Sequence, residues 1–204
     1  MSTRTLTATL PSDTLYVSGT VNGVTTTWTN TQEQMWETVA ERSENDIYVV
    51  ALTIINSVGA VTETTFTLYY GLHLVTDRTQ ADVTARNQKG TYNASDLNRV
   101  GAAMIYVADK LREMGYAPSV SPKTDWVDLE WFTPSAAMVY LKDLEELRRQ
   151  FAMMQTTPDV PAGMDRFTHQ EANNIEKILE DIDLLLTNAA KAWFFSGDVF
   201  SGEV

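Results

Sequence analysis

The stretch THQEANNIEKILEDIDLLLTNAAKAWFF, residues 168–195, decides the helical part of the fold. Its apolar residues recur at alternating steps of three and four, which places them in one stripe along a single face of a helix. Thr168 and Glu171 have the spacing of a capping box, in which each side chain accepts a hydrogen bond from the other residue's backbone N–H. The sequence therefore predicts one long helix that begins after Thr168. Its stripe consists of Ala172, Ile175, Leu179, Ile182, Leu186, Ala189 and Trp193.

This stripe is wider than one neighbouring helix can cover. Ile178 and Leu185 extend it on one flank, which is typical of a helix inside a bundle. We therefore expect the stripe to be the seam of a helical bundle, formed within one chain or across subunits of an oligomer.

Two upstream segments have helical spacing and clear end signals. Residues 95–114 can be capped by Asn93 or Ser95, and Gly115 follows as the C-terminal stop. The next helix is capped by Thr133, and the proline after it suits the first helical position. Its inward residues are expected to be Met138, Leu141, Leu144, Leu147, Phe151 and Met154. Together with the long C-terminal helix, these segments predict a three-helix bundle with heptad-like seams, or part of a larger bundle across subunits.

Residues 1–70 have the period-two alternation and the threonine density of β-strands. Asn22-Gly23 is a type I′ turn signal, so residues 15–21 and 24–29 are expected to form a hairpin. The run IYVVALTII is expected to be a central, well-buried strand. Roughly five to seven short strands with no room for helices favour an immunoglobulin-like or fibronectin-like β-sandwich.

Trp28, Trp36 and Tyr48 are the aromatic residues expected in the core of this sandwich. The polar segment of residues 32–45 is expected to interrupt the strands with a short turn or helix. The period of the apolar pattern changes after this β region, from two to the spacing of a helix. We therefore expect two domains.

The two expected domains are a sandwich at residues 1–70 and a helical bundle at residues 93–204, which ends in an extended tail. Residues 71–92 form a polar junction between them, in which residues 79–87 can form a short helix.

No group of residues has the pattern of a catalytic or metal site. The two histidines, His73 and His169, lie far apart in the sequence. Glu180, Asp181 and Asp183 point in different directions around a helix, so we expect a solvated polar face and not a pair of catalytic carboxylates. The sequence contains no cysteine and no glycine-rich phosphate loop. We therefore expect no enzyme activity, no cofactor and no metal.

The loop of residues 117–132 is long for a compact domain and is rich in aromatic side chains. Trp126, Trp131 and Phe132 can form a patch that docks another protein or stacks on a sugar. Alternatively, these rings plug the end of the helical bundle. The sequence leaves both alternatives open.

The charge of the chain excludes several classes of partner. Its 204 residues carry a formal net charge of −12, which is spread over the β and helical parts. Such a surface repels phosphates and anionic lipid, so nucleic acid is not an expected partner. No apolar stretch approaches the roughly 20 residues that span a bilayer, so no membrane insertion is expected. The N-terminus lacks the pattern of a signal peptide, so we expect synthesis in the cytoplasm.

Three strings in the C-terminal part carry a resemblance: TYNASDLNRVGAAM at residues 91–104, SPKTDW at 121–126 and EANNIEKILEDIDLLL at 171–186. With the aromatic and SGD/SGE ending, this part resembles a family of phage and prophage virion structural proteins. The resemblance implies a tail, baseplate or particle-surface component that is made in the host cytoplasm and incorporated in the virion. An immunoglobulin-like N-terminal domain also suits this family, because virion proteins often carry such modules.

Two functions from different classes follow. The first is a virion structural protein that oligomerises through its helices and contacts other virion proteins. The resemblance favours a trimer, because many virion parts obey threefold symmetry. The second is a carbohydrate-binding or adhesin module, in which the sandwich or the loop tryptophans bind a host-surface glycan. The missing signal peptide favours the first function, because virions assemble in the cytoplasm whereas a host adhesin must be exported.

Overall fold

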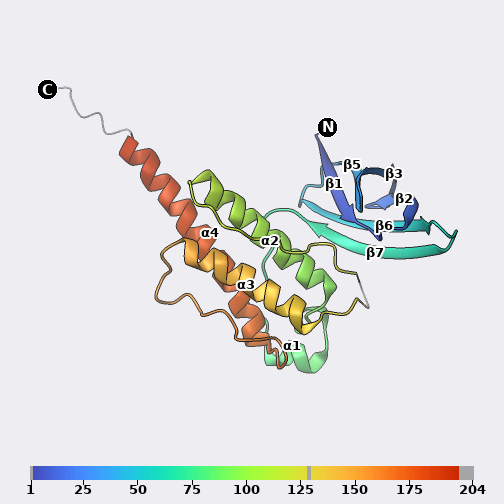
Figure 1. The fold of residues 1–204 in the computed structure, drawn as a ribbon. Coiled ribbons are helices and arrows are strands. Elements are labelled where there is room, and N and C mark those ends of the chain that lie inside the picture. Colours follow the sequence, from blue (N-terminus) through green and yellow to red (C-terminus); the bar gives the residue numbers. More distant parts are fainter. Residues whose placement is uncertain (1, 128–129, 198–204) are drawn as a thin grey trace. The chain divides into compact units, whose positions relative to one another are not determined.

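The computed structural model describes residues 2–127 and 130–197, without the side chains of residues 193–197 (Figure 1). Within this part of the chain, an antiparallel β region of seven strands in two sheets is followed by a region of about four helices. The fold is therefore of the α+β class. The expected C-terminal tail lies outside the described residues.

The chain divides into two compact units. Unit 1 consists of Met1–His73, Tyr92–Ala102 and Lys123–Trp131. Unit 2 consists of Leu74–Thr91, Ala103–Pro122 and Phe132–Val204. Unit 1 thus contains the β region, the first half of one helix and part of the loop that follows that helix. The domain boundary between residues 70 and 93 stays a prediction, because independent folding of either part is a property of the separated chains.

The smaller sheet has the strand order β1-β5-β4, with β1 at Thr3–Thr9, β5 at Met35–Glu41 and β4 at Thr29–Gln32. Residues 32–45 contain the expected turn, at Glu33–Gln34 and again at Glu44–Asn45, but strand β5 lies between the two turns, so the segment as a whole does not interrupt the strands. The residues of β5 alternate between buried and exposed, and their charged side chains lie on the exposed face. The segment is polar because only one of its faces is buried, which is the ordinary condition of a strand in an antiparallel sheet.

The larger sheet has the order β3-β2-β6-β7. Its strands are β2 (Thr14–Val21), β3 (Val24–Thr27), β6 (Ile47–Asn56) and β7 (Val61–Tyr69). The hairpin of β2 and β3 is confirmed, with Asn22 and Gly23 at φ values of 50° and 79° as a type I′ turn requires.

The central position expected for the run IYVVALTII is confirmed, because β6 pairs with both β2 and β7. Its burial alternates along the strand, so only one of its faces contributes to the core. The buried residues of both sheets form one apolar cluster. Trp28, Trp36 and Tyr48 belong to it, as the sequence predicts, and at most 6% of each residue is exposed.

The region after β7 begins with a short helix, α1, at Gln80–Ala85. Thr79 caps it, and the side chains of Thr79 and Asp82 form a reciprocal capping box. The expected short helix in the junction is therefore present. A 3₁₀ turn, η1 at Gln88–Gly90, follows it.

Helix α2 spans Ala94–Glu113 and belongs to unit 1 up to Ala102 and to unit 2 from Ala103 onward. Asn93 caps it, since its Oδ1 accepts hydrogen bonds from the backbone N–H groups of Ser95 and Asp96. Gly115 ends it at a φ of +89°. The N–H of Gly115 donates to Arg112 and that of Tyr116 to Leu111, the pattern of a Schellman C-cap.

Helix α3 spans Pro134–Gln150 and is capped by Thr133, as the sequence predicts. Leu141, Leu144 and Leu147 are buried. Two other expectations for this helix are wrong. Met138 is 73% exposed, because it lies one turn before Leu141 at the edge of the leucine stripe, where it lines an open pocket. Phe151 is the C-cap in an extended conformation, so Met154 lies beyond the helix.

Helix α4 spans His169–Gly197 and its 29 residues extend over about 43 Å. The capping box is confirmed: the hydroxyl of Thr168 accepts from the N–H of Glu171, and Glu171 Oε2 accepts from the N–H of Thr168. Within the described residues, no helix is long and apolar enough to cross a membrane.

Candidate functional site

The predicted seam of α4 is covered mostly by the chain itself. Ala172, Ile175, Leu179, Ile182 and Leu186 are each at most 2% exposed. These five residues form the inner face of α4 in unit 2 and leave no surface there for another copy. The remaining two seam residues lie further along the helix. Ala189 is half-buried, and the side chain of Trp193 lies outside the described residues. A role for this C-terminal part in oligomerisation stays a prediction.

The loop after α2 is attached to that helix by a buried asparagine in unit 1. Asn98 Nδ2 donates to the carbonyl oxygen of Trp126 at 2.9 Å, and its Oδ1 accepts from the N–H of Trp126 at 2.7 Å. The backbone passes close to the helix at Gly101, where a Cβ atom would lie 2.7 Å from the Lys123 carbonyl oxygen. Asn98 and Gly101 therefore hold the loop backbone against α2.

The same loop is attached to the β region on its other side. Asp125 Oδ2 accepts from the backbone N–H of Thr9, at the end of β1, at 2.9 Å. Lys123 lies over the ring of Trp126, with Nζ 4.5 Å from the ring centroid, and forms an ion pair with Glu130 at 2.6 Å. The segment is thus held by contacts to a strand and to a helix within unit 1.

The three candidate docking residues of this loop have different environments. Trp126 is only 9% exposed, so its ring packs into unit 1 and offers little surface to a partner. Trp131 is 88% exposed, which is the largest exposed fraction of the large apolar residues in the described chain. Phe132 is partly buried and packs edge-on against Tyr140 of α3, with a centroid distance of 6.3 Å. Trp131 is therefore the candidate for docking, whereas Trp126 is an internal residue of unit 1. That the loop rings plug the end of the helical bundle stays a prediction.

Unit 2 has a pocket of about 390 Å³ beside the first half of α3, which we call the α3 pocket. One wall comes from α3 and the residues just before it, and the other from the loop between α3 and α4. Its lining includes Phe132, Ala137, Met138, Leu141, Met164 and Asp165. Apolar side chains predominate, and two of them are methionines, which adapt readily to different partners.

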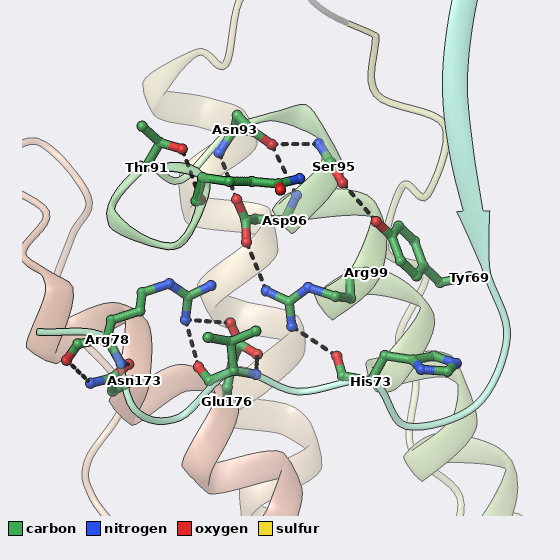
Figure 2. A network of polar contacts seen from close by, with 12 residues as sticks. Tyr69, His73, Arg78, Thr91, Asn93, Ser95, Asp96, Arg99, Asn173 and Glu176 are labelled. Carbon is green, nitrogen blue, oxygen red and sulfur yellow. Dashed lines mark hydrogen bonds and ion pairs between the residues drawn. The ribbon is translucent and has the colours of Figure 1, made fainter. Parts of the chain in front are cut away.

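A buried ion pair joins the junction segment to α4 in unit 2 (Figure 2). Arg78 Nη1 lies 2.7 Å from Glu176 Oε1, and both side chains are at most 2% exposed. The other carboxylate oxygen of Glu176 accepts from the N–H of Val75. Asn173 completes the attachment, since its side chain accepts from the N–H of Arg78 and donates to the Arg78 carbonyl oxygen. These contacts fix the segment from Val75 to Arg78 along one turn of α4.

A second polar network lies in unit 1, at the start of α2 (Figure 2). Arg99 donates to the carbonyl oxygen of His73 at 2.8 Å and forms an ion pair with Asp96 at 2.8 Å. Ser95 is hydrogen-bonded to the hydroxyl of Tyr69, the last residue of β7, at 2.7 Å. This network positions the first turn of α2 against the end of the β region.

The expectation of a solvated acidic face on α4 is wrong for one of its three acids. Asp181 is fully buried, accepts from the hydroxyl of Thr157 at 2.8 Å and forms an ion pair with Lys177 at 2.6 Å. Glu180 is exposed, and Asp183 forms an ion pair with Lys110 of α2. The hydrogen bonds that the Lys177 ammonium group donates to Asp181 and Glu180 raise its pKa.

A further acid, Asp143 on α3, is also buried. Asp143 is 8% exposed and accepts from the backbone N–H of Ser121. Burial raises the pKa of the Asp143 carboxyl group above its ordinary value. The half-buried Asp82 shows the opposite effect. Hydrogen bonds from Asn87 and Thr79 lower the pKa of the Asp82 carboxyl group to about 2.

The two histidines do not share a site. His73 Nε2 is 3.0 Å from the carbonyl oxygen of Tyr70, and its ring packs against Tyr69. His169 is the first residue of α4. Among the described residues, no three histidine, aspartate or glutamate side chains are grouped so that they could hold a metal ion.

Sequence reasoning missed Glu176, Arg78 and Asn98, the residues that attach one segment to another. A signal was present for Glu176, which lies four residues after Ala172 and three before Leu179 and so on the buried face of α4. Its partner Arg78 had no such signal.

Comparisons with protein-family models, with curated proteins and with solved structures found no match for this chain.

Proposed function

We propose that this chain is a structural protein of a phage or prophage particle, in the tail, the baseplate or at the particle surface. Its assignment to a particle rests on the resemblance of residues 91–104, 121–126 and 171–186 to virion structural proteins. In this proposal the chain is made in the host cytoplasm, associates with copies of itself and with other virion proteins, and has no enzymatic role.

We further propose that the β region is a sandwich of the immunoglobulin or fibronectin type, and that α2, α3 and α4 form the bundle that carries it. Two antiparallel sheets that share a single apolar cluster support the first part. The buried stripe of α4 and the leucines of α3 support the second. The bundle is the part in which we expect oligomerisation, with threefold symmetry as the first choice.

One observation supports a function in assembly: the indole of Trp131 is exposed, whereas the backbone of its loop is fixed by hydrogen bonds. The indole is 88% exposed, whereas the loop backbone is attached to β1 through Asp125 and to α2 through Asn98. Exposed tryptophans on well-held backbone are typical of interface hot spots, because little conformational entropy is lost when they are buried. We infer that Trp131 contacts another protein in the assembled particle.

The second candidate function is carbohydrate binding, which the same exposed indole favours, because a flat aromatic ring can stack on a sugar. Lys123 and Glu130, which lie in the same loop, could supply hydrogen bonds to hydroxyl groups. This alternative makes the chain a receptor-binding component and needs no export of the protein by its host.

The proposed function is tested on particles purified from the strain whose phage or prophage encodes this chain. We expect the chain to band with the particles in a density gradient at a fixed ratio to the capsid protein. An in-frame deletion of its gene should remove one feature from electron micrographs of the tail, baseplate or surface. A chain that stays entirely in the soluble lysate while intact particles form would contradict the proposal.

Trp131→Ala separates the two candidates. If Trp131 is a protein contact, this variant should be depleted from purified particles while the isolated chain stays folded. If it is a sugar contact, the variant should be incorporated normally and the particles should adsorb poorly to cells. Tyr16→Ala, which removes another exposed aromatic side chain, is the matched control.

A further inference from the structure

The outer face of the smaller sheet combines exposed apolar side chains with carboxylates. Strand β5 turns Met35, Glu37, Val39 and Glu41 toward this face, because the residues between them are buried. Threonines of β1 lie beside three of these residues in the paired register: Thr3 opposite Glu41, Thr5 opposite Val39 and Thr7 opposite Glu37. We call the surface formed by these seven residues the β5 face.

The carboxylates of the β5 face have no cation of their own. Among the described residues, neither Glu37 nor Glu41 takes part in an ion pair. Residues 1–75 contain only two lysine or arginine residues, Arg4 and Arg42. Both of them form ion pairs with Asp46, at 3.2 and 3.0 Å. The β5 face therefore carries negative charge that the two arginines of the β region do not balance.

An apolar side chain lies between the two carboxylates. Val39 is 60% exposed, and Met35 at the start of the strand is 38% exposed. Glu37 and Glu41 are four residues apart on one strand, which separates them by roughly 13 Å, with Val39 midway. A partner that covers Val39 thus meets a carboxylate on either side. Burial of Val39 and Met35 favours association, and the carboxylates select the partner that can cover them.

The outer face of the larger sheet shows that this charge is local. The four strands of that sheet contain a single charged residue, Glu63 of β7, and its side chain is exposed. The other residues that face outward there are apolar or carry a hydroxyl group. We therefore expect attraction for a cationic partner at the smaller sheet and not over both sheets alike.

We propose that the β5 face docks a partner protein whose surface presents lysine or arginine side chains around an apolar centre. Charge complementarity identifies this occupant, because such a surface supplies the cations that Glu37 and Glu41 lack. Nucleic acid and anionic lipid are repelled by the same carboxylates. The β5 face of a second copy is equally negative and does not fit. The inference goes beyond the contact of Trp131, and it rests on the proposed function only in taking the partner to be another protein of the particle.

The exposed position of the carboxylates predicts how this contact responds to salt. Exposed ion pairs are individually weak, and salt screens them, since the Debye length is about 8 Å at physiological ionic strength and shorter above it. Binding at the β5 face should therefore weaken steadily as salt is added. A contact made by Val39 and Met35 alone would instead be nearly insensitive to salt.

The first test uses the full chain and a short synthetic peptide of alternating lysine and valine, with binding followed by fluorescence anisotropy of the labelled peptide. The double variant Glu37→Gln with Glu41→Gln should weaken binding about tenfold, because two exposed ion pairs are lost. Glu63→Gln with Glu113→Gln removes the same number of exposed charges elsewhere and should bind as the unmodified chain does. Val39→Thr should also weaken binding, and a peptide of alternating glutamate and valine should not bind.

The second test locates the contact in purified particles. A carbodiimide joins a carboxylate to a lysine amine that touches it, so the linked peptides identify the partner by mass spectrometry. We expect Glu37 and Glu41 to be linked to lysines of one other particle protein, and Glu63 to remain unlinked.

Several results would overturn this inference. If the peptide does not bind, or if the two double variants lose equal affinity, the β5 face has no specific attraction for cations. If the chain is in the particles but Glu37 and Glu41 form no links, or links only to lysines of this chain, a different protein does not cover the face. A chain that is absent from particles but keeps the difference between the two double variants would refute the proposed function alone.

Discussion

The β region and the helical region of this chain are each stabilised by a different kind of internal contact. In the seven strands, the buried side chains are apolar apart from Thr38, and they form a single cluster. In the helical part, charged side chains lie inside as well. Arg78, Asp143, Glu176 and Asp181 are all at most 8% exposed.

This difference separates contacts that need only an apolar neighbour from contacts that need one particular partner. A buried valine is stabilised by any well-packed apolar surface. A buried carboxylate is costly unless a specific donor or cation reaches it. The β region can therefore tolerate exchange among apolar residues, whereas the helical region depends on pairs such as Glu176 with Arg78. In the helical region, specific pairs of polar side chains therefore determine which segments are attached to one another.

The largest expected effect is at the Arg78–Glu176 pair. Glu176→Ala leaves the buried guanidinium of Arg78 without this carboxylate and the N–H of Val75 without its acceptor. We expect a loss of about 3–5 kcal/mol in the free energy of unfolding, as for other broken buried pairs. Denaturant unfolding followed by the helical circular dichroism signal measures it.

Two further variants sharpen this test. Glu180→Ala removes an exposed acid of the same helix and should change stability by at most about 0.5 kcal/mol. The double variant Arg78→Met with Glu176→Leu replaces the pair by apolar side chains and should lose less than Glu176→Ala alone. If Glu176→Ala and Glu180→Ala behave alike, the pair does not stabilise the helical region and the comparison of the two regions fails.

The same difference decides how much of the fold could be predicted from the sequence. The β2–β3 hairpin and the helices α2, α3 and α4 were predictable because turn residues, caps and apolar spacing act within a few positions of the chain. Strand β5 was missed because a strand with one exposed face contains as many polar as apolar residues. Met138 was expected to face inward because it lies three residues before Leu141, which fits the helical stripe. The buried part of that stripe begins only after Met138.

The candidate site was predictable only as a list of aromatic residues. The sequence could not show that Trp126 is buried and Trp131 exposed, because that depends on where Asn98 and Asp125 attach the loop. These attachments join residues 28 and 116 positions apart, respectively. Likewise, Asp181 lies three residues after Ile178 and Asp143 four before Leu147, but the sequence does not show that Thr157 and Ser121 reach these two carboxylates. No local pattern contains that information.

The two loop tryptophans give the next largest effect and a comparison within one segment. Trp126→Ala should cost about 3–5 kcal/mol, because a buried aromatic ring is replaced by a cavity. Trp131→Ala should change the unfolding free energy of the monomer by at most about 0.5 kcal/mol, because its ring is exposed. Denaturant midpoints of the single variants measure both, at concentrations where the chain is monomeric. Equal losses for the two would show that Trp131 also packs inside the fold.

A smaller effect is expected from the asparagine that attaches the loop to α2. Asn98→Ala leaves the N–H and the carbonyl group of Trp126 without their buried partners, which should cost about 1–3 kcal/mol. Asn188→Ala, at an exposed position of α4, is the matched control and should be nearly neutral. Amide exchange of Trp126 should accelerate in the first variant and stay slow in the second. Slow exchange in both would mean that the loop is held without Asn98.

The smallest effect has an unusual sign and concerns Asp143. Burial holds the pKa of its carboxyl group above the value of 3.8 that applies in the unfolded chain. Near neutral pH the group is ionised in both states, and burial penalises the folded one. As the pH falls through the folded pKa, the folded state takes up a proton first and this penalty disappears, completely so below 3.8.

Asp143→Asn removes this titration and keeps an oxygen that can accept from the N–H of Ser121. The variant should therefore equal or exceed the unmodified chain in stability at neutral pH, and its advantage should shrink as the pH is lowered toward 4. The measurement is the difference between the two denaturant midpoints at each pH, in which the titration of all other groups cancels.

Asp82 provides the opposite case, because its pKa of about 2 means that its capping bonds weaken when acid protonates it. Asp82→Asn should therefore differ from the unmodified chain most at neutral pH, as the less stable protein. An advantage of Asp143→Asn that grows on acidification would show that the ionised carboxylate stabilises the fold, and the cost assigned to buried charge at this position would be wrong.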